Sequence, residues 1–162
     1  MTTIAFSSGI MAADSRASDN DARGVFVTKC QKIYRLANNC LLGTAGDDDS
    51  REVQALLGKC KGPKSLPTRA ELAATRTDFA GILVFPKGQI YLIDIRMREY
   101  EHTGEWSGEV LESRERYAAT GSGQEFALGA MAHGASAAQA VAIAAKFDLA
   151  TGGPIVSVAL KK

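Results

Sequence analysis

The chain has 162 residues, of which 46% are hydrophobic and 23% are charged. This length favours one domain spanning residues 1–162, and the composition excludes an intrinsically disordered chain. The net charge of +1 argues against a nucleic-acid partner, because proteins that bind nucleic acids usually carry a basic excess. No apolar stretch is long enough to span a bilayer and no secretory signal is visible, so we expect a cytoplasmic protein with no membrane partner.

The first third of the chain predicts short antiparallel strands joined by turns. Residues 3–6 and 10–13 flank the turn sequence Ser7-Ser8-Gly9 and are typical of a hairpin. Residues 14–23 predict a loop, and further short strands are expected at 25–27, 33–36 and 40–44. We therefore expect the strands of this region to follow one another as a meander.

The middle of the chain predicts two helices followed by a hairpin. The acidic run 47–49 with Ser50 indicates the start of one helix, and Thr68 with Glu71 has the spacing of a capping box for a second. Residues 79–85 and 89–95 surround a Pro-Lys-Gly turn and predict the hairpin, with residues 96–106 as an exposed extension of it.

The last third predicts a short strand at 117–120, two alanine-rich helices and a final strand at 155–160. The helices are expected to begin near Gln124 and Ser136, and their many alanines predict close helix packing. The order strands, helices, strands, helices, strand indicates an α+β fold. The glycine turn at 121–123 lacks the rest of a dinucleotide-binding fingerprint, so a doubly wound nucleotide fold is not expected.

The three cysteines give no sign of a disulfide framework or a metal site. Cys30, Cys40 and Cys60 are irregularly spaced, and they form no zinc pattern with His102 and His133. We expect free thiols in a reducing compartment, and we predict neither a metal nor an organic cofactor.

The second residue of the chain is a candidate nucleophile. Removal of Met1 would leave Thr2 at the N-terminus, with a hydroxyl and an α-amine on the same residue. An α-amine with a reference pKa of about 7.7–8.0 is partly neutral near physiological pH and can take the hydroxyl proton. Many chains begin Met-Thr, so this feature alone assigns no function.

Six further segments give the N-terminal threonine its context. They read TTIAF (2–6), GIMAADSRAS (9–18), KIYRL (32–36), LLGTAG (41–46), GSG (121–123) and DLATGG (148–153). In this order they resemble proteasome β-subunits and the bacterial HslV-type threonine peptidases, which are N-terminal-nucleophile hydrolases. The resemblance covers nearly the whole chain. It implies a four-layer αββα sandwich, peptide-bond hydrolysis through an acyl ester on the threonine, and a bacterial proteasome homologue.

The resemblance assigns roles around the nucleophile. Thr2 matches the nucleophile itself, and Asp14 and Lys32 match the acid–lysine pair beside it. A lysine at this place stabilises the oxyanion and lowers the pKa of the neighbouring amine, while the aspartate holds the lysine. Gly46 matches the residue whose backbone amide faces the oxyanion, and Gly43 is the competing glycine in the same segment.

A second set of residues is implied to support the N-terminal amine. Ser122, Asp148 and Thr151 match a Ser–Asp–Ser set, in which the last residue is usually serine. Thr151 keeps the hydroxyl and adds a methyl group. Ser122 is also placed to cap the helix that follows the glycine turn, and the two interpretations are compatible.

Six residues fall near the family's S1 substrate pocket: Ala17, Cys30, Tyr34, Thr44, Asp48 and Glu52. The two acidic groups among them favour a basic side chain before the scissile bond. The alternative is that the acidic run 47–49 only caps the helix and faces solvent.

The resemblance also implies partners. It predicts a homo-oligomer of two stacked rings, with heptameric rings favoured over hexameric ones, that cleaves peptide substrates. No ATP site is visible in the sequence, so an ATP-dependent unfoldase would be a separate chain. Two alternatives stay open: a catalytically silent ring subunit, and an N-terminal-nucleophile amidase acting on a small molecule.

Overall fold

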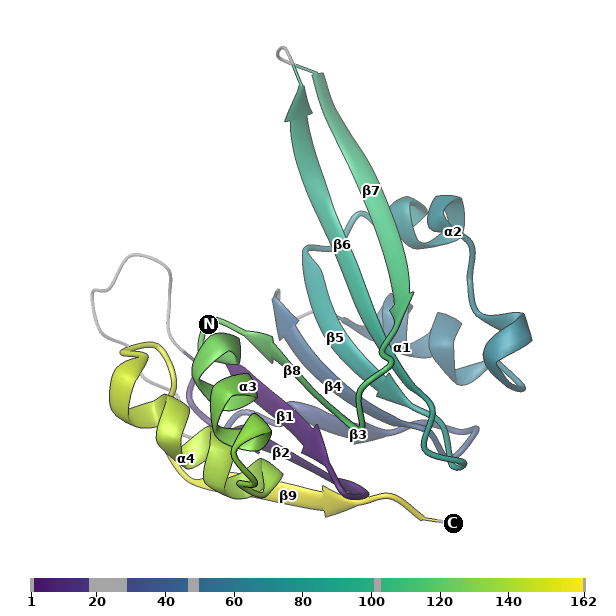
Figure 1. The fold of residues 1–162 in the computed structure, drawn as a ribbon. Helices are drawn as coiled ribbons and strands as arrows, with labels where there is room; N and C mark the ends of the chain where they lie inside the picture. Colours follow the sequence, from purple (N-terminus) through teal and green to yellow (C-terminus); the bar gives the residue numbers. More distant parts are fainter. Residues whose placement is uncertain (1, 18–28, 47–49, 101–102, 162) are drawn as a thin grey trace.

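The computed structural model describes residues 2–17, 29–46, 50–100 and 103–161 (Figure 1). The strands found there are β1 (Thr3–Ser7), β2 (Ile10–Asp14), β3 (Ile33–Arg35), β4 (Leu41–Gly46), β5 (Phe79–Val84), β6 (Ile90–Tyr100), β7 (Thr103–Glu112), β8 (Tyr117–Gly121) and β9 (Ile155–Ala159). The helices are α1 (Arg51–Gly58), α2 (Arg69–Ala74), α3 (Gln124–Ala132) and α4 (Ala137–Phe147), with a short 3-10 turn at Pro63–Ser65.

The strands form two antiparallel sheets, which confirms the predicted mixture of helices and antiparallel strands. One sheet has the order β8-β1-β2-β9 and the other has the order β3-β4-β5-β6-β7. The expected meander is wrong, because β1–β2 and β3–β4 belong to different sheets. The reason is that β8 and β9, from the far end of the chain, occupy both free edges of the β1–β2 hairpin. The strand expected at 25–27 lies outside the described residues.

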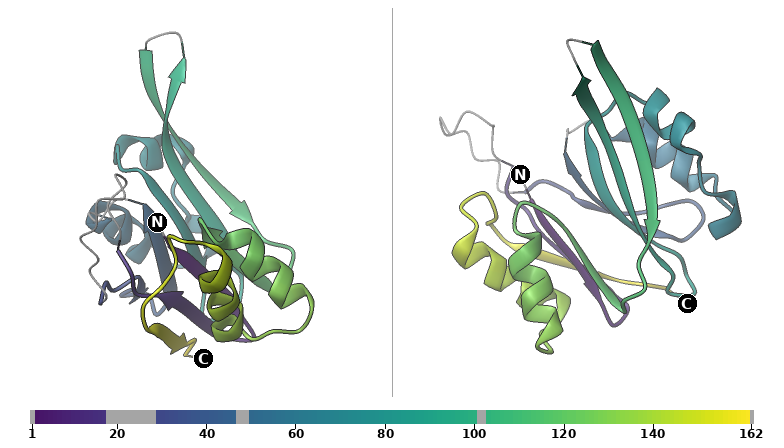
Figure 2. Two further views of the ribbon diagram at one scale, coloured as in Figure 1. Left: turned by 90° about the vertical axis from the view of Figure 1, so that its left-hand side faces the viewer. Right: turned by 45° about the horizontal axis from the view of Figure 1, so that its top comes forward.

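Three clusters of buried apolar residues pack the sheets and helices against one another. One cluster lies between the two sheets and joins Ile4, Phe6 and Met11 of the first sheet to Leu41 and Ile82 of the second. The other clusters lie on the opposite faces of the sheets, under the helices (Figure 2). The pair α3 and α4 covers the face of the first sheet, while α1 and α2 cover the face of the second. The central strands of both sheets are therefore buried on two faces, whereas the edge strand β9 is largely exposed.

The cluster under α3 and α4 consists largely of alanine, as the close helix packing predicted for this region requires. Ala5 and Ala12 of the sheet meet Ala127, Ala140 and Ala144 of the helices, and all five are fully buried. Small side chains let the helices approach the sheet closely, so larger residues would overfill this interface.

Local signals in the sequence account for where two helices begin. The Thr68 side chain accepts from the Glu71 amide while Glu71 bonds back to the Thr68 amide, which confirms the predicted capping box of α2. Ser136 and Gln139 make the same reciprocal bonds at the start of α4. Each cap satisfies backbone N–H groups that the helix itself leaves unpaired.

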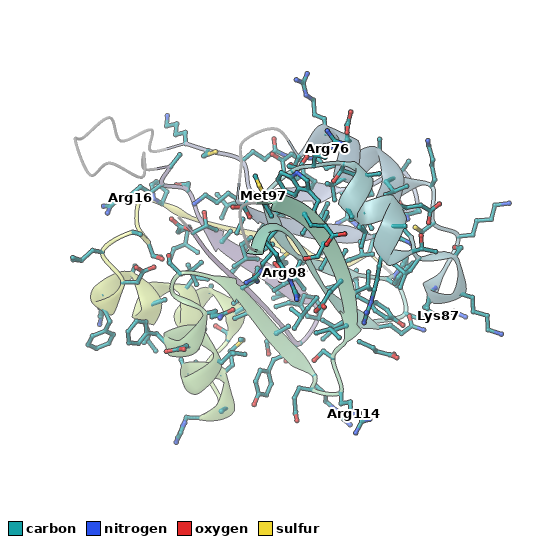
Figure 3. The ribbon with its side chains drawn as sticks, turned by 90° about the horizontal axis from the view of Figure 1, so that it is seen from above. Arg16, Arg76, Lys87, Met97, Arg98 and Arg114 are labelled. Atoms are coloured by element: carbon teal, nitrogen blue, oxygen red, sulfur yellow. The ribbon has the colours of Figure 1, made fainter. Side chains whose placement is uncertain are left out.

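The β6–β7 hairpin extends well beyond the rest of its sheet (Figure 1). The sequence predicts residues 96–106 as an exposed extension of the preceding hairpin, whereas the structure continues β6 to Tyr100 and pairs it with a separate strand, β7. Met97 and Arg98 lie on opposite sides of this hairpin (Figure 3), as strand alternation requires. Gly108 of β7 is buried where α2 crosses it, because a side chain there would meet Leu72 and the α2 backbone.

Candidate active site

Of the predicted site residues, Thr2, Asp14 and Ser122 lie where β1 begins and β2 and β8 end (Figure 1). Strand pairing fixes this arrangement, since Thr3 lies opposite Gly121 on β8 and Ile4 lies opposite Ala13 on β2. Thr2 precedes β1 and is only 5% exposed. Continued alternation from Ile4 directs its side chain towards the second sheet.

Asp14 and Lys32 form a buried ion pair beside the start of β1. Lys32 Nζ lies 2.9 Å from Asp14 Oδ1, and the side chains are 6% and 0% exposed. Three backbone amides also donate to the Asp14 carboxylate: Thr3 at 2.9 Å, Gly152 at 3.0 Å and Arg16 at 3.2 Å. The carboxylate therefore has donors on both oxygens, which is the condition for burying a charged group.

Arg16 is a residue of this site that the sequence analysis did not single out. Its carbonyl accepts a 2.5 Å hydrogen bond from Lys32 Nζ, so the ammonium group is held from two sides. Its side chain reaches across to donate to the Leu149 carbonyl at 3.1 Å and lies against Gly152, where an added Cβ would be 2.5 Å from the guanidinium carbon (Figure 3). Arg16 thus links the segment after β2 to the loop after α4.

The predicted Ser–Asp–Thr set meets around one carboxylate oxygen. Ser122 Oγ and Thr151 Oγ1 donate to Asp148 Oδ2 at 2.6 and 2.5 Å, and the Ala150 amide donates to Asp148 Oδ1 at 3.1 Å. Burial alone would raise the pKa of Asp148, but these hydrogen bonds hold that pKa below its ordinary value. Ser122 Oγ also lies 3.4 Å from the Thr2 carbonyl oxygen.

The helix-cap interpretation of Ser122 is wrong. The residue that caps α3 is Gly123, with no side-chain cap, and the Ser122 hydroxyl is engaged with Asp148 instead. Asp148 is the C-cap residue of α4. The Ser122–Asp148–Thr151 set is therefore built from the turn before α3 and the end of α4.

Thr3 joins the two carboxylate centres. Its amide donates to Asp14 Oδ1, and its hydroxyl lies 2.5 Å from the hydroxyl of Thr151, which donates to Asp148. The sequence analysis missed Thr3 as a site residue. No signal in the local sequence marks Thr3, because its partner Thr151 is 148 positions away.

The two glycines that compete for the oxyanion role have different surroundings. Gly43 is buried between the sheets, where an added Cβ would lie 2.6 Å from Ile4 and 2.9 Å from Met11. Gly46 is exposed at the end of β4 with φ of +114°, and a side chain there would overlap the carbonyl of Asp78. Gly43 therefore has a packing role. Of the two glycines, only Gly46 has the exposed backbone that a donor to the oxyanion needs.

The predicted substrate-pocket residues are placed less uniformly. Cys30 and Thr44 flank Lys32, since the Thr44 amide bonds to the Lys32 carbonyl at 2.9 Å and Cys30 precedes Lys32 by two residues. Ala17 is half-buried in the segment after β2. Tyr34 packs against the cluster under α1 and α2, with its hydroxyl on the Gln31 carbonyl. Glu52 is exposed in the first turn of α1, and Asp48 lies outside the described residues.

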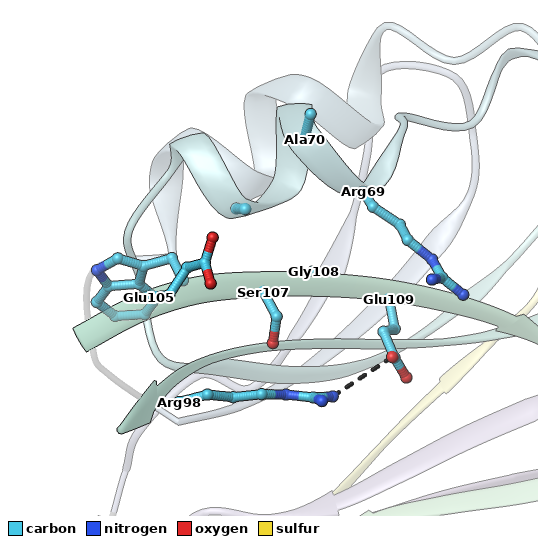
Figure 4. A pocket seen from close by; sticks show the side chains of 9 residues that line it. Arg69, Ala70, Arg98, Glu105, Ser107, Gly108 and Glu109 are labelled. Atoms are coloured by element: carbon cyan, nitrogen blue, oxygen red, sulfur yellow. Dashed lines mark hydrogen bonds and ion pairs between the residues drawn. The ribbon is translucent and has the colours of Figure 1, made fainter. Parts of the chain in front are cut away.

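A separate groove of about 400 Å³ follows β7 where α2 crosses it (Figure 4). Its walls carry Arg69 and Arg98 together with Glu105 and Glu109, and Arg98 pairs with Glu109 at 3.4 Å. None of the predicted site residues lines this groove. Among the described residues, no group of three or more His, Cys, Asp or Glu side chains is placed to hold a metal ion, and no helix is long and apolar enough to cross a membrane.

Two antiparallel sheets pack through an apolar core with helices on their other faces, and Thr2 lies beside a buried ion pair where β1 begins.

Solved structures that match this fold include HslV from Trypanosoma brucei, a eukaryotic HslV, with a TM-score of 0.67. The match covers 99% of this chain and 99% of that chain, at 15% sequence identity, and it shows a shared fold. No protein-family model and no curated protein matches the sequence.

Proposed function

We propose that this chain is a threonine endopeptidase in which Thr2, exposed by removal of Met1, is the nucleophile and its α-amine is the general base. The four-layer αββα sandwich that goes with this function is supported by the three apolar clusters. One observation carries the proposal: Asp14 Oδ1 accepts hydrogen bonds from both Lys32 Nζ and the Thr3 amide, each at 2.9 Å. A buried ammonium group is thereby held beside the residue that follows Thr2.

In the proposed reaction, the Thr2 hydroxyl attacks the carbonyl carbon of the scissile peptide bond and gives its proton to the Thr2 amine. The new C–O bond places negative charge on the former carbonyl oxygen. The Gly46 amide is the proposed donor to that oxygen, and the Lys32 ammonium supplies positive charge to the site. Collapse of the intermediate breaks the C–N bond, and the protonated amine returns its proton to the leaving nitrogen.

The second half of the reaction uses the same groups. Water attacks the acyl ester on Thr2, and the α-amine takes a proton from that water. The bond between the acyl carbon and Thr2 Oγ then breaks, the ammonium group returns its proton to Oγ, and the free acid leaves. The Ser122–Asp148–Thr151 set is the proposed source of negative charge near this amine, which would favour the protonated form that each step generates, and its Ser122 Oγ lies 3.4 Å from the Thr2 carbonyl oxygen. Thr151 donates to Asp148 at 2.5 Å, so the threonine retains the hydrogen bond expected of the usual serine.

We further propose that the chain works as a homo-oligomer of two stacked rings, heptameric rather than hexameric, fed by a separate ATP-dependent unfoldase. The shared fold with HslV supports a ring-forming peptidase. Exposed apolar residues on the edge strand β9, Ile155 and Val156, and the exposed stacked rings of Phe126 and Phe147 suit burial against other copies. Native mass spectrometry of the purified protein measures the number of subunits directly.

The test of the peptidase assignment combines the Thr2→Ala and Thr2→Ser variants with N-terminal mass analysis and a fluorogenic peptide assay. We expect the wild-type mass to lack Met1, Thr2→Ala to lose activity, and Thr2→Ser to retain a measurable fraction because it keeps a hydroxyl. Full activity of Thr2→Ala would refute the assignment. Peptides ending in Arg or Leu also test the acidic pocket, since faster cleavage after Leu would exclude it.

A peptide epoxyketone separates the active enzyme from the alternative of a silent ring subunit. This reagent reacts with both the hydroxyl and the free amine of an N-terminal threonine. Labelling of a protein that has lost Met1 supports catalysis. Failure to label that same processed protein would favour the silent subunit.

A further inference from the structure

Thr3 is the polar residue at the start of β1, and it is 0% exposed. Its backbone amide is committed to Asp14 Oδ1 at 2.9 Å. Its side chain lies on the opposite side of the strand from Ile4, towards the layer of α3 and α4. A hydroxyl at such a place needs a hydrogen-bond partner, because an unpaired buried hydroxyl is costly.

The partner is the hydroxyl of Thr151, and the direction of the bond follows from the neighbouring contacts. Thr151 Oγ1 lies 2.5 Å from Asp148 Oδ2, and the ionised carboxylate can only accept, so the Thr151 proton is used there. The Thr3 hydroxyl, 2.5 Å from Thr151 Oγ1, must then be the donor between the two threonines. The protons therefore point in one direction along a chain from Thr3 through Thr151 to Asp148, and each bond polarises the next.

The surrounding backbone closes tightly on this hydroxyl. A Cβ built on Gly123 would overlap Thr3 Oγ1, and it would lie 3.0 Å from Ala144 Cβ and 3.2 Å from Asp148 Oδ2. The glycine turn before α3 can approach Asp148 because position 123 has no side chain. The Thr3 hydroxyl thus lies in a closed site between the turn, α4 and the loop after α4.

We propose that Thr3 is a positioning residue of the peptidase site, which ties the start of β1 to the Asp14–Lys32 pair through its amide and to the Ser122–Asp148–Thr151 set through its hydroxyl. This inference rests on the proposed function. Because Thr3 is bonded covalently to Thr2, fixing both of its polar groups fixes the Thr2 amine and hydroxyl between the two carboxylates. Thr3 touches no reacting atom, so its effect is exerted through Thr2 and Asp148.

The test compares Thr3→Val, which keeps the shape and removes the hydroxyl, with Thr3→Ser, which keeps the hydroxyl. For Thr3→Val we expect kcat on a fluorogenic peptide to fall by about 10- to 100-fold, as for a small misplacement of reacting groups. We expect KM to change by less than about threefold, because the substrate pocket is not altered. Thr3→Ser should recover most of the lost kcat. Wild-type kcat in Thr3→Val, or equal impairment of both variants, would overturn the proposal.

Thr120→Val is the matched control. Thr120 is a buried threonine on the adjacent strand β8, opposite Ile4, and it lies outside the chain of hydroxyls that leads to Asp148. We expect Thr120→Val to leave kcat and KM within about twofold of the wild type. A loss in this control equal to the loss in Thr3→Val would show a general effect on packing and would contradict a positioning role.

Thermodynamic coupling distinguishes failure of this inference from failure of the proposed function. Unfolding free energies are measured for Thr3→Val, Thr151→Val and the double variant. If the hydroxyl chain exists, the double variant loses less stability than the sum of the single losses. Additive losses would refute the bridge even in an active enzyme. If the losses in the variants are coupled but the wild-type protein, with Met1 removed, has no peptidase activity, the bridge exists and the proposed function is refuted, and with it the catalytic role of the bridge.

Discussion

Replacing Lys32 by methionine removes the ammonium group from the buried ion pair and keeps most of the side-chain stem. Asp14 would then remain at 0% side-chain exposure with three backbone amides but without the Lys32 ammonium group. Breaking a buried pair by removing one partner costs about 3–5 kcal/mol, because the charge left behind is uncompensated. We expect Lys32→Met to lower the free energy of unfolding by this amount, a large share of a total of about 5–15 kcal/mol.

The measurement is urea unfolding at neutral pH and one protein concentration, on the wild type, Lys32→Met, Asp14→Asn and the double variant. Asp14→Asn also destabilises, since an amide cannot accept on both sides from the backbone donors. The double variant has no unpaired buried charge, so it should lose about 1–3 kcal/mol less than the sum of the two single losses. A loss below about 1 kcal/mol for Lys32→Met, or additive losses, would refute the reasoning that this pair is buried and mutually dependent.

Three further predictions concern pH, thiols and a helix glycine. Hydrogen bonds hold the pKa of Asp148 below its ordinary value of 3.8, so its contribution to stability should be complete above that pH and decline as the pH falls through the lowered value; a constant difference in unfolding free energy between wild type and Asp148→Asn from pH 2 to 6 would contradict this. Burial raises the pKa of Cys40 to about 11, so an aromatic disulfide reagent at pH 8 should label the half-buried Cys30 before Cys40. In the Cys30→Ser variant Cys40 should react more slowly than a small free thiol, and faster reaction would contradict this prediction. Gly129 is exposed within α3 with nothing near an added Cβ, so Gly129→Ala should raise the unfolding free energy by about 0.5–1 kcal/mol, and a decrease in thermal unfolding temperature would count against it.

The elements that the sequence predicts well are those with a strong local signal. The turn Ser7-Ser8-Gly9 gives the β1–β2 hairpin because Ser8 and Gly9 both adopt positive φ. The capping boxes at Thr68 and Ser136 mark helix starts because their bonds join residues three apart. In each case the whole interaction lies within a few residues of the chain.

The errors concern features that depend on distant residues. Which sheet a hairpin joins is decided by the strands that arrive later, and β9 reaches β2 from the other end of the chain. β7 escaped prediction as a strand of its own because its paired length includes Gly104 and Gly108, and glycine weakens strand patterns. Gly108 is required by the approach of α2, which no window of the local sequence reveals.

The candidate site shows the same division. The resemblance predicted site residues one by one, and the structure brings Asp14 to Lys32 across 18 positions and Ser122 to Asp148 across 26. Thr3 was missed because its partner, Thr151, is 148 residues away, and a threonine in a β-strand is an ordinary residue until that partner is known.

The packing of β1 has a consequence for the chemistry at its end. Ile4 and Phe6 fill the core between the sheets, whereas Ala5 faces the alanine layer beneath the helices. Shifting this strand by a single position would drive the isoleucine and the phenylalanine into a space that accepts only methyl groups. The packing of Ile4 and Phe6 therefore fixes the register of β1, and with it the position of Thr2 at the candidate site.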